Sequence, residues 1–309
     1  MEEGGIQVTR NRAFILIFLG ASLWGIIGLF VNELYEYGLS PIQVVALRVT
    51  SAMVMLFSYI LVSNTALLKI KPADTSYFFG TGVISIALFN WCLFSAIEAT
   101  SMSIAFVLLY TAPVFVTIFS RMFFKETWTG RKLMALVTTF IGCTFVIGLL
   151  PELEASLSLA GFLFGLGSGL FYALYSIFGK VILKKYPSLT VTFYTFVFAT
   201  IAVVPFSRLW NDADVLTDGR VWLLILGLGL ISTVMPFLLY TKGLQHVESS
   251  RASIVATIEP VVATLVGYFV YAEVMTVYQY AGVALVLLSV IIVNESKKKP
   301  ARYREKSAS

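Results

Sequence analysis

The chain has 309 residues, of which 58% are hydrophobic and only 13% are charged. A soluble domain carries about 25% charged residues, and one soluble core could not hide this excess of apolar side chains, so the composition excludes a soluble domain and predicts a membrane protein. The net charge of +5 does not indicate nucleic-acid binding, because the basic residues lie in short loops and at the C-terminus. Membrane topology explains that distribution.

Ten apolar segments follow one another, and each is long enough to cross about 30 Å of hydrocarbon. They cover residues 13–32, 41–62, 75–97, 101–124, 130–150, 159–183, 189–207, 220–243, 250–272 and 277–294. The first segment follows Arg10 and Arg12 and has no small-residue cleavage site, so it is predicted to be a retained span rather than a signal peptide. The longest connection, SRLWNDADVLTDGR, leaves no room for a folded domain.

The basic residues are distributed unequally between the two sides of the predicted membrane. Nineteen Lys and Arg residues fall on the side of the N-terminus, only Arg208 and Arg220 fall on the other side, and Arg48 lies within a span. Short loops rich in Lys and Arg stay in the cytoplasm. We therefore predict a multi-pass protein of the plasma or inner membrane with both termini cytoplasmic, which agrees with an even number of spans.

Two stretches, Ile104 to Glu126 and Arg251 to Glu273, match each other without a gap at a constant offset of 147 residues. Five positions are identical, namely Ala105/Ala252, Pro113/Pro260, Val114/Val261, Thr117/Thr264 and Glu126/Glu273. In each long apolar helix the proline removes a backbone donor and displaces the carbonyl four residues earlier, so we expect kinks at Pro113 and Pro260. Paired broken helices at corresponding points of two halves are typical of a transporter's central site.

The repeat extends beyond these helices. Residues 88–147 lie over residues 235–294 at the same offset, and Trp24 lies over Tyr172 at an offset of 148. Each half therefore holds five spans, and because five is odd, the halves have opposite orientations in the membrane. Two mirror-related halves can exchange inward-open and outward-open shapes, which is the architecture of alternating access.

The sequence thus predicts an all-α membrane protein of ten transmembrane helices, arranged as two inverted five-helix repeats. The first repeat covers residues 1–150 and the second covers residues 151–296. Residues 297–309 form a basic tail, which we expect in the cytoplasm.

These residues resemble the drug/metabolite transporter superfamily, in its EamA-type branch. The matching pieces are GASLWGIIG, ALRVTSA, Thr111-Ala112-Pro113, Lys125-Glu126 and LLYTKGLQHVESSRASIVATIEPVVATLVGYFVYAE. The resemblance covers essentially the whole chain and implies the ten-helix fold. It also implies a carrier that moves amino acids, other metabolites or drugs, usually outward, and it is poorly specific for the substrate.

Glu259 is the sharpest candidate for a functional residue. It lies eight residues into the ninth span, immediately before Pro260. A carboxylate inside the membrane is costly and usually marks a proton, ion or substrate site. Glu259 could take up a proton or bind a substrate ammonium, and the structural alternative is a protonated carboxyl hydrogen-bonded to carbonyls freed by the kink. Its counterpart in the first half is Ala112, so the predicted site is asymmetric.

Two polar residues of the first half are further candidates for the substrate or coupling site. Arg48, in the second span, could pair with a substrate carboxylate through both of its terminal nitrogens, or could instead extend outward or hold a helix end. The family carries a similar Leu-Arg pair here, which favours the structural role. Asn90, in the third span, could contact substrate, although hydrogen bonding between helices is the alternative.

Four aromatic residues, Trp24, Tyr110, Tyr172 and Tyr175, could line an amphipathic cavity. Aromatic residues in spans more often pack or anchor at the interface. The coincidence of Trp24 with Tyr172 under the repeat favours cavity lining for these two.

Glu126 and Glu273 end the two kinked helices, where the resembling family has a glycine-Glu turn. Lys125 and Ala272 stand here in place of the glycine. We expect each glutamate to cap a helix or to anchor one helix to another at the surface.

We predict a secondary-active carrier that exports a small metabolite, such as an amino acid or a related compound, by alternating access. Its partners are the lipid bilayer and a small-molecule substrate, and the proton is a candidate coupling ion. A passive, channel-like facilitator and a multidrug efflux carrier are the alternatives, although a channel is expected to show a repeated selectivity ring.

The sequence predicts neither an enzyme nor an ATP-driven motor. It contains no Walker pattern and no His/Glu, Ser/Lys or paired-Asp constellation in the spans. His246 has no nearby Cys or second His, and Cys92 and Cys143 lie in apolar segments, so no metal site and no cofactor are predicted. Substrate identity, transport direction, coupling ion and oligomeric state stay open.

Overall fold

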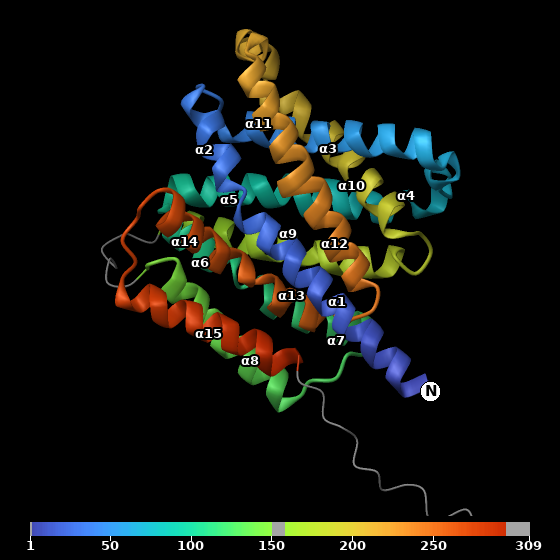
Figure 1. Cartoon of the computed structure of the whole chain (residues 1–309), viewed down its shortest axis with the longest axis vertical. Coiled ribbons are helices and arrows are strands. Elements are labelled where there is room, and N and C mark those ends of the chain that lie inside the picture. The colour runs from blue at the N-terminus through green and yellow to red at the C-terminus, as the bar shows by residue number, and fades with distance from the viewer. Residues whose placement is uncertain (1, 150–157, 295–309) are drawn as a thin grey trace, which may run out of the picture.

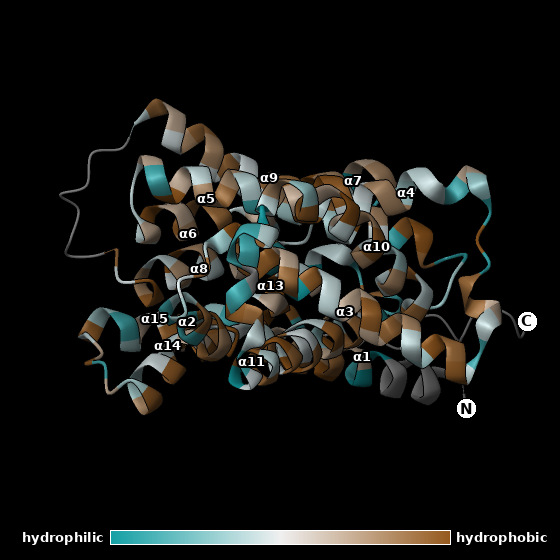
Figure 2. Ribbon diagram, turned by 90° about the horizontal axis from the view of Figure 1, so that it is seen from above, coloured by the Kyte–Doolittle hydropathy of each residue, from teal (hydrophilic) through white to brown (hydrophobic). Residues whose placement is uncertain are grey.

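The computed structural model describes residues 2–149 and 158–294, with side chains from residue 10 onward except that of Ala213. These residues form helices, turns and short connections, without a strand (Figure 1). Nine of the described helical stretches are long and apolar enough to cross a membrane: Arg10–Glu36, Pro41–Ser63, Pro72–Ala99, Met102–Phe124, Leu159–Ile182, Ser188–Ser207, Gly219–Leu244, Ser249–Val270 and Val277–Asn294. Figure 2 shows hydrophobic residues over most of the length of these helices. The predicted fold class is confirmed, and the predicted tail, 297–309, lies outside the described residues.

The fifth predicted span, 130–150, is shorter in the structure than each of these nine stretches. In the described part of the chain, α8 covers the 17 residues Gly130–Val146, which rise about 26 Å at 1.5 Å per residue. It packs along α15 (Val277–Asn294). A short helix that lies against a longer one completes the fifth position of its half.

The elements of the two halves follow each other in the same order. The first half contains α1 (Glu2–Gly25), α2 (Gly28–Glu36), α3 (Pro41–Ser63), η1 (Thr65–Leu68), η2 (Pro72–Asp74), α4 (Thr75–Phe79), η3 (Gly80–Leu88), α5 (Phe89–Ala99), α6 (Met102–Leu109), α7 (Ala112–Phe124) and α8. The second half contains α9 (Leu159–Ile182), α10 (Ser188–Ser207), η4 (Leu209–Thr217), α11 (Gly219–Gly229), η5 (Leu230–Val234), α12 (Met235–Leu244), α13 (Ser249–Ala256), α14 (Ile258–Val270) and α15.

Local sequence signals mark where several of these helices begin. The side chain of Ser158 accepts a hydrogen bond of 3.0 Å from the amide of Gly161 at the start of α9. Thr129 does the same for the amide of Lys132 at the start of α8, at 3.3 Å. A serine or threonine at this position satisfies an amide that has no partner within the helix. These caps explain why the helices begin where they do.

The two proline-containing helices are interrupted at equivalent positions. The first is divided into α6 and α7, and Pro113 is the second residue of α7. The second is divided into α13 and α14, and Pro260 is the third residue of α14. Proline is tolerated in a first helical turn, where its missing amide would have no intrahelical partner. The predicted kinks are confirmed as breaks that lie just before each proline.

A second irregularity recurs, and the sequence did not indicate it. Residues Gly80–Leu88 (η3) and Leu230–Val234 (η5) are π-helical. Shifted by the offset of 147, η5 falls within η3. Wide turns of this type often occur at functional sites, and both lie next to the centre of the molecule.

The contacts between helices of the two halves are reciprocal. Helix α1 of the first half packs against α12 of the second, and α5 of the first half packs reciprocally against α9 of the second. Helix α3 packs on α10, and α8 packs on α15, so equivalent helices meet in each of these pairs. Such reciprocal contacts are those of a two-fold arrangement, and they place the centre of the molecule between the halves.

Two glycines let helices approach the breaks closely. A Cβ at Gly169 in α9 would come within 3.0 Å of the carbonyl oxygens of Leu108 and Leu109, at the end of α6. A Cβ at Gly25 in α1 would collide with the carbonyl oxygen of Glu259 and with Val262, in α14. In each half the interrupted helix is therefore held by direct backbone contact with the first helix of the other half.

Candidate functional site: a cavity between the two halves

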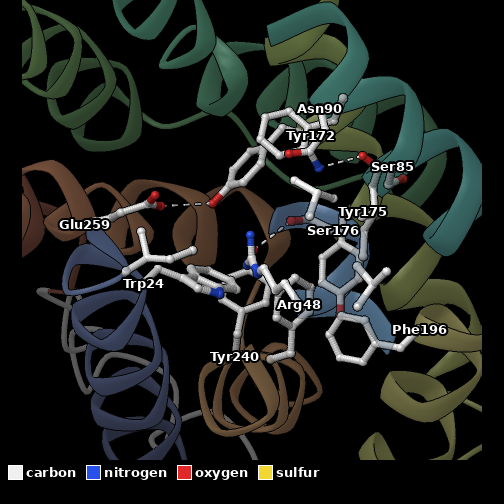
Figure 3. Close-up of a pocket in the computed structure, with 16 residues that line it drawn as sticks. Trp24, Arg48, Ser85, Asn90, Tyr172, Tyr175, Ser176, Phe196, Tyr240 and Glu259 are labelled. Atoms are coloured by element: carbon white, nitrogen blue, oxygen red, sulfur yellow. Dashed lines mark hydrogen bonds between the residues drawn. The ribbon is translucent and has the colours of Figure 1, made fainter. Parts of the chain in front are cut away.

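A cavity with about 740 Å³ of empty space, including the part open to solvent, lies between the two halves (Figure 3). The residues that line it are Trp24, Ile27, Val45, Arg48, Val49, Ser85, Ile86, Phe89, Asn90, Tyr172, Tyr175, Ser176, Phe196, Phe237, Tyr240 and Glu259. Most of the wall is aromatic or aliphatic, and Arg48 and Glu259 are its charged groups. A mostly apolar pocket with few polar groups is typical of small-molecule sites.

Glu259 enters the cavity from the first turn of α14, directly after the helix break. The hydroxyl of Tyr172 donates a hydrogen bond to its Oε2 at 3.4 Å. The positive end of the helix dipole favours a negative charge at this position. Among the described residues no backbone carbonyl bonds to the carboxyl group, so the geometry favours a group that is available to a ligand over a structural bond at the kink.

Arg48 reaches the same cavity from α3 of the other half. Its Nε donates to the hydroxyl of Thr233 at 3.0 Å, and its guanidinium carbon lies 5.9 Å from the centre of the Phe237 ring. The side chain therefore neither extends outward to the membrane surface nor holds a helix end. Figure 3 shows it on a different wall from Glu259, and no salt bridge is found between the two in the described part of the chain.

Two further donors lack partners in the cavity wall. Trp24 and Tyr175 are each 6% exposed, and the indole nitrogen of Trp24 and the hydroxyl of Tyr175 have no hydrogen-bond partner among the described residues. Both rings are fixed by edge contacts with Phe237, at centroid distances of 5.1 and 5.2 Å. Buried polar groups normally find a partner, so these two donors are free to bond a polar group inside the cavity.

The remaining predicted residues divide between the wall and its surroundings. Asn90 lines the cavity, and its amide nitrogen donates to the carbonyl of Ile86 at 2.8 Å in the same helix. The bond within one helix replaces the predicted alternative of a bond between helices. Tyr110 is buried at the end of α6 and does not line the cavity. Six of the seven predicted binding residues thus meet at one place.

Several wall residues were missed by sequence reasoning, although the repeat carried a signal for some of them. Phe237 is the repeat counterpart of Asn90 at the offset of 147, and Ile27 is the counterpart of Tyr175 at the offset of 148. Transferring each predicted residue to its counterpart would have found both. Tyr240, whose hydroxyl lies 2.7 Å from that of Ser176, had no such signal, because its counterpart is outside the wall.

The arrangement offers one positive group, one negative group and several neutral donors within an aromatic enclosure. Such a site suits a small molecule with both a carboxylate and an ammonium group, because each charge can meet its complement. In the described residues no group of three His, Cys, Asp or Glu side chains could hold a metal ion.

Two inverted halves of membrane-crossing helices, broken at a shared cavity, define a multi-pass membrane protein of the transporter class. The chain belongs to the EamA-like transporter family, whose model matches residues 11–148 and again residues 159–295. The resemblance stated from the sequence is thereby confirmed.

Curated relatives are also named as transporters. An uncharacterized transporter of Archaeoglobus fulgidus is 32% identical over 282 residues, which cover 89% of this chain and 94% of the relative. The uncharacterized inner membrane transporter YicL of Salmonella typhimurium is 22% identical, with 95% of this chain and 99% of the relative covered. The pseudopaline exporter CntI of Pseudomonas aeruginosa is 26% identical, with 69% and 72% covered.

A crystal structure of another protein has the same fold. It superposes with a TM-score of 0.76 at 17% sequence identity, and the match covers 92% of this chain and 97% of that one. At this identity the likeness concerns the fold alone.

Proposed function

We propose that the protein is a secondary-active transporter that exports a small zwitterionic metabolite, such as an amino acid or a related compound, by alternating access. The observation that carries the proposal is the position of Glu259 and Arg48 on different walls of one cavity between inverted halves. A substrate that bridges them would neutralise both charges. That neutralisation offsets the cost of keeping charges away from water.

The helix breaks support the mechanism. Substrate sites formed by broken helices at the interface of inverted repeats are accessible from either side when one half rocks against the other. Pro113 and Pro260 mark the breaks, and we propose that they let α6–α7 and α13–α14 gate opposite ends of the cavity. Glu259 takes the ammonium of the substrate or a coupling proton at the break itself.

Two other functions make different demands on the same cavity. The aromatic wall and Glu259 suit a lipophilic cation, which is the multidrug alternative, but Arg48 would repel such a substrate at close range. A passive facilitator would use the cavity without coupling to a gradient. The multidrug carrier differs from a coupled carrier of zwitterions in the substrates it transports, and the passive facilitator differs in that it cannot transport against a gradient.

The proposed location is the plasma or inner membrane, with both termini in the cytoplasm. The excess of Lys and Arg on one side supports it, as does the name of the inner membrane relative. A cysteine introduced in the connection 208–220 should react with an impermeant reagent in intact cells. Reaction only after permeabilisation would show that this connection lies in the cytoplasm and that the proposed orientation is wrong.

The function is tested with the full chain in proteoliposomes and a panel of labelled amino acids. We expect at least one zwitterion to accumulate against its gradient when a pH gradient is imposed, and to exchange faster when unlabelled substrate is present on the far side. Flux without this acceleration would indicate a facilitator. Transport of lipophilic cations with no zwitterion transported would indicate a multidrug carrier.

A further inference from the structure

Glu126 joins the two halves at one end of the molecule. It is 8% exposed, and its carboxylate accepts hydrogen bonds from the backbone amides of Ser249 and Ser250, at 2.7 and 3.3 Å, and from the Ser250 hydroxyl at 2.5 Å. These amides open α13, the helix of the other half that leads to Glu259. A carboxylate here caps the free amides and meets the positive end of the helix dipole.

Charged neighbours reinforce this contact. The ammonium of Lys132 lies 3.7 Å from Glu126 and 3.0 Å from Glu248, and Arg251 lies 2.6 Å from Glu248. Burial opposes ionisation of Glu248, but its hydrogen bonds and attraction to Lys132 and Arg251 outweigh burial and lower its pKa. The lowered pKa keeps Glu248 ionised at neutral pH, and its ion pairs with Lys132 and Arg251 connect the start of α8 to the start of α13.

Glu273 is the repeat counterpart of Glu126, and its backbone is placed in the same way. The amide of Glu126 donates to the carbonyl of Ser120 at 3.3 Å, and that of Glu273 donates to the carbonyl of Gly267, the counterpart of Ser120, at 3.1 Å. The residue before each glutamate is left-handed, with φ of 56° at Lys125 and 55° at Ala272. Both glutamates are thus presented by the same turn.

The side chains of the two glutamates differ completely in their contacts. Glu273 is exposed, and within the described chain its carboxylate has no hydrogen-bond partner. Its expected partners are the amides of Met102 and Ser103, the counterparts of Ser249 and Ser250, at the start of α6. No side chain in the described residues bonds to these two amides, and the cap of α6, Ser101, bonds instead to the amide of Ile104 at 3.3 Å.

The packing of the neighbouring helices also differs between the Glu126 end and the Glu273 end of the molecule. Helix α13 packs against α7 at the Glu126 end. The counterparts of these helices are α6 and α14, which Figures 1 and 2 place toward one end of the molecule. Helix α6 packs against α5, α8 and α9, whereas α14 packs against α1, α8 and α15. The structure is therefore closed at the Glu126 end and separated at the Glu273 end.

We propose that Glu126 and Glu273 are alternating latches, that is, residues that each hold one end of the molecule closed in turn. Glu126 bound to the start of α13 closes one end. Glu273 bound to the start of α6 closes the other end once the Glu126 contact has broken. The proposal rests on the alternating-access function proposed above and adds the residues that hold each state. The two-fold relation of the halves supplies the second state. When the two halves exchange conformations, the Glu273 carboxylate contacts the amides of Met102 and Ser103, just as the Glu126 carboxylate contacts those of Ser249 and Ser250 in this structure.

The two latches differ in strength. Lys132 supports Glu126, but its repeat counterpart is the neutral Gln279, whose amide bonds to the carbonyl of Val146 at 3.4 Å. Glu248 and Arg251 have Ser101 and Ile104 as counterparts. The Glu273 latch therefore lacks supporting charges, so the empty protein rests in the state closed at Glu126.

The test measures distances between spin labels on the purified full chain in lipid nanodiscs, with Cys92 and Cys143 replaced by Ala. Leu159 and Val274, both exposed, carry the labels for the Glu273 end, and the exposed Met122 and His246 carry those for the Glu126 end. Glu126→Gln and Glu273→Gln retain shape and lose the charge. Glu98→Gln, an exposed carboxylate of α5, is the matched control.

We expect Glu126→Gln to shift the population by roughly tenfold or more toward long distances at the Glu126 end and short distances at the Glu273 end, because charge-assisted hydrogen bonds are about twice as strong as neutral ones. Glu273→Gln should remove the minor short-distance population at its own end, and Glu98→Gln should leave both distributions unchanged.

Two outcomes would overturn the latches. In one, Glu126→Gln lowers thermal stability without moving either distribution, which is the behaviour of a fixed helix cap. In the other, Glu273→Gln has no effect while the wild type still shows a state closed at the Glu273 end. If the wild type shows one fixed state at both ends, with or without the transported substrate, alternating access itself fails, and that result is distinct from a failure of the latches.

Discussion

The two halves share their backbone but not the side chains that face the cavity. The breaks before Pro113 and Pro260 and the left-handed residues Lys125 and Ala272 recur at an offset of 147, and the π-helical segments overlap at the same offset. At that offset Glu259 corresponds to Ala112, so the first half has no counterpart of this carboxyl. The repeat therefore builds the fold, and departures from the repeat build the site.

Lipid explains why the backbone features are retained in both halves. Every polar backbone group in the hydrocarbon needs a partner, so a break persists only where neighbouring protein or a wet cavity receives it. Which side chain stands next to each break depends instead on the residues that surround it. Ala112 is packed with Val116, Ala173 and Ile177, where a carboxylate would have no partner, whereas Glu259 faces the cavity.

The largest expected effect comes from removing the charge that one half alone carries. Glu259→Gln retains the shape and one hydrogen bond with Tyr172 but cannot titrate or neutralise an ammonium. Losing one partner of a buried charge pair costs about 2–5 kcal/mol, so we expect uphill transport to fall by on the order of 100-fold while the protein still expresses and folds. Initial rates against pH in proteoliposomes measure this.

The control for Glu259 is Glu33→Gln, an exposed carboxylate of α2 away from the cavity wall, which should transport as wild type does. Superimposable pH–rate curves for wild type and Glu259→Gln would mean that the carboxyl is structural. The asymmetry between the halves would then have no role in coupling.

The second-largest expected effect comes from Arg48, the positively charged group of the site. Arg48→Lys keeps the charge but loses the planar fork that can bind a carboxylate through two nitrogens, so we expect KM for a zwitterionic substrate to rise about tenfold. The methyl ester of the same substrate has no carboxylate to bind, and its weaker transport should be insensitive to the change. An equal loss for acid and ester would show that Arg48 only maintains the cavity.

A smaller effect is expected from the prolines, which the halves share. Pro113→Ala and Pro260→Ala each allow one more backbone hydrogen bond across a break, worth about 0.5–1.5 kcal/mol. Each should straighten one helix and change the accessibility of a cavity cysteine at Ser85 by roughly two- to tenfold. The two variants should act in opposite directions, because the halves are inverted. A change in the same direction for both would contradict a gating role at opposite ends.

The sequence predicted the repeated features better than the unrepeated ones. The apolar segments were sufficient to predict the ten helices, and the paired prolines were sufficient to predict the breaks, because both depend on chemistry that a sequence displays. The inversion followed from the ungapped repeat and the odd number of spans in each half. The π-helical segments were not predicted, since GTGVISIAL and LISTV read as ordinary apolar helix. Their register depends on contacts between helices.

The site was predicted where polar residues stood out against lipid, and missed where they did not. Arg48, Asn90 and Glu259 are costly in a membrane and were chosen for that reason. Tyr240 looks like any aromatic residue of a span until helix packing turns it into the cavity, whereas Phe237 could have been found only through its repeat counterpart Asn90. Tyr110 was chosen as an aromatic residue within a span, but it is buried in the protein and does not line the cavity.

The smallest expected effect tests the most symmetric feature, the left-handed residue before each glutamate. A side chain at positive φ is strained by about 1–2 kcal/mol, and glycine relieves that strain at some cost in chain entropy. Lys125→Gly and Ala272→Gly should therefore each stabilise the protein by up to about 1 kcal/mol, seen as a rise of about 1–2 °C in Tm at a fixed scan rate. Lys125→Ala removes the charge without relieving the strain, so it separates the two causes and should give no rise. Equal gains from both glycines would show that the turns are energetically alike and that the two ends differ only in what their glutamates contact. A gain at Ala272 alone would mean that the Glu126 contacts already compensate for the strain at Lys125.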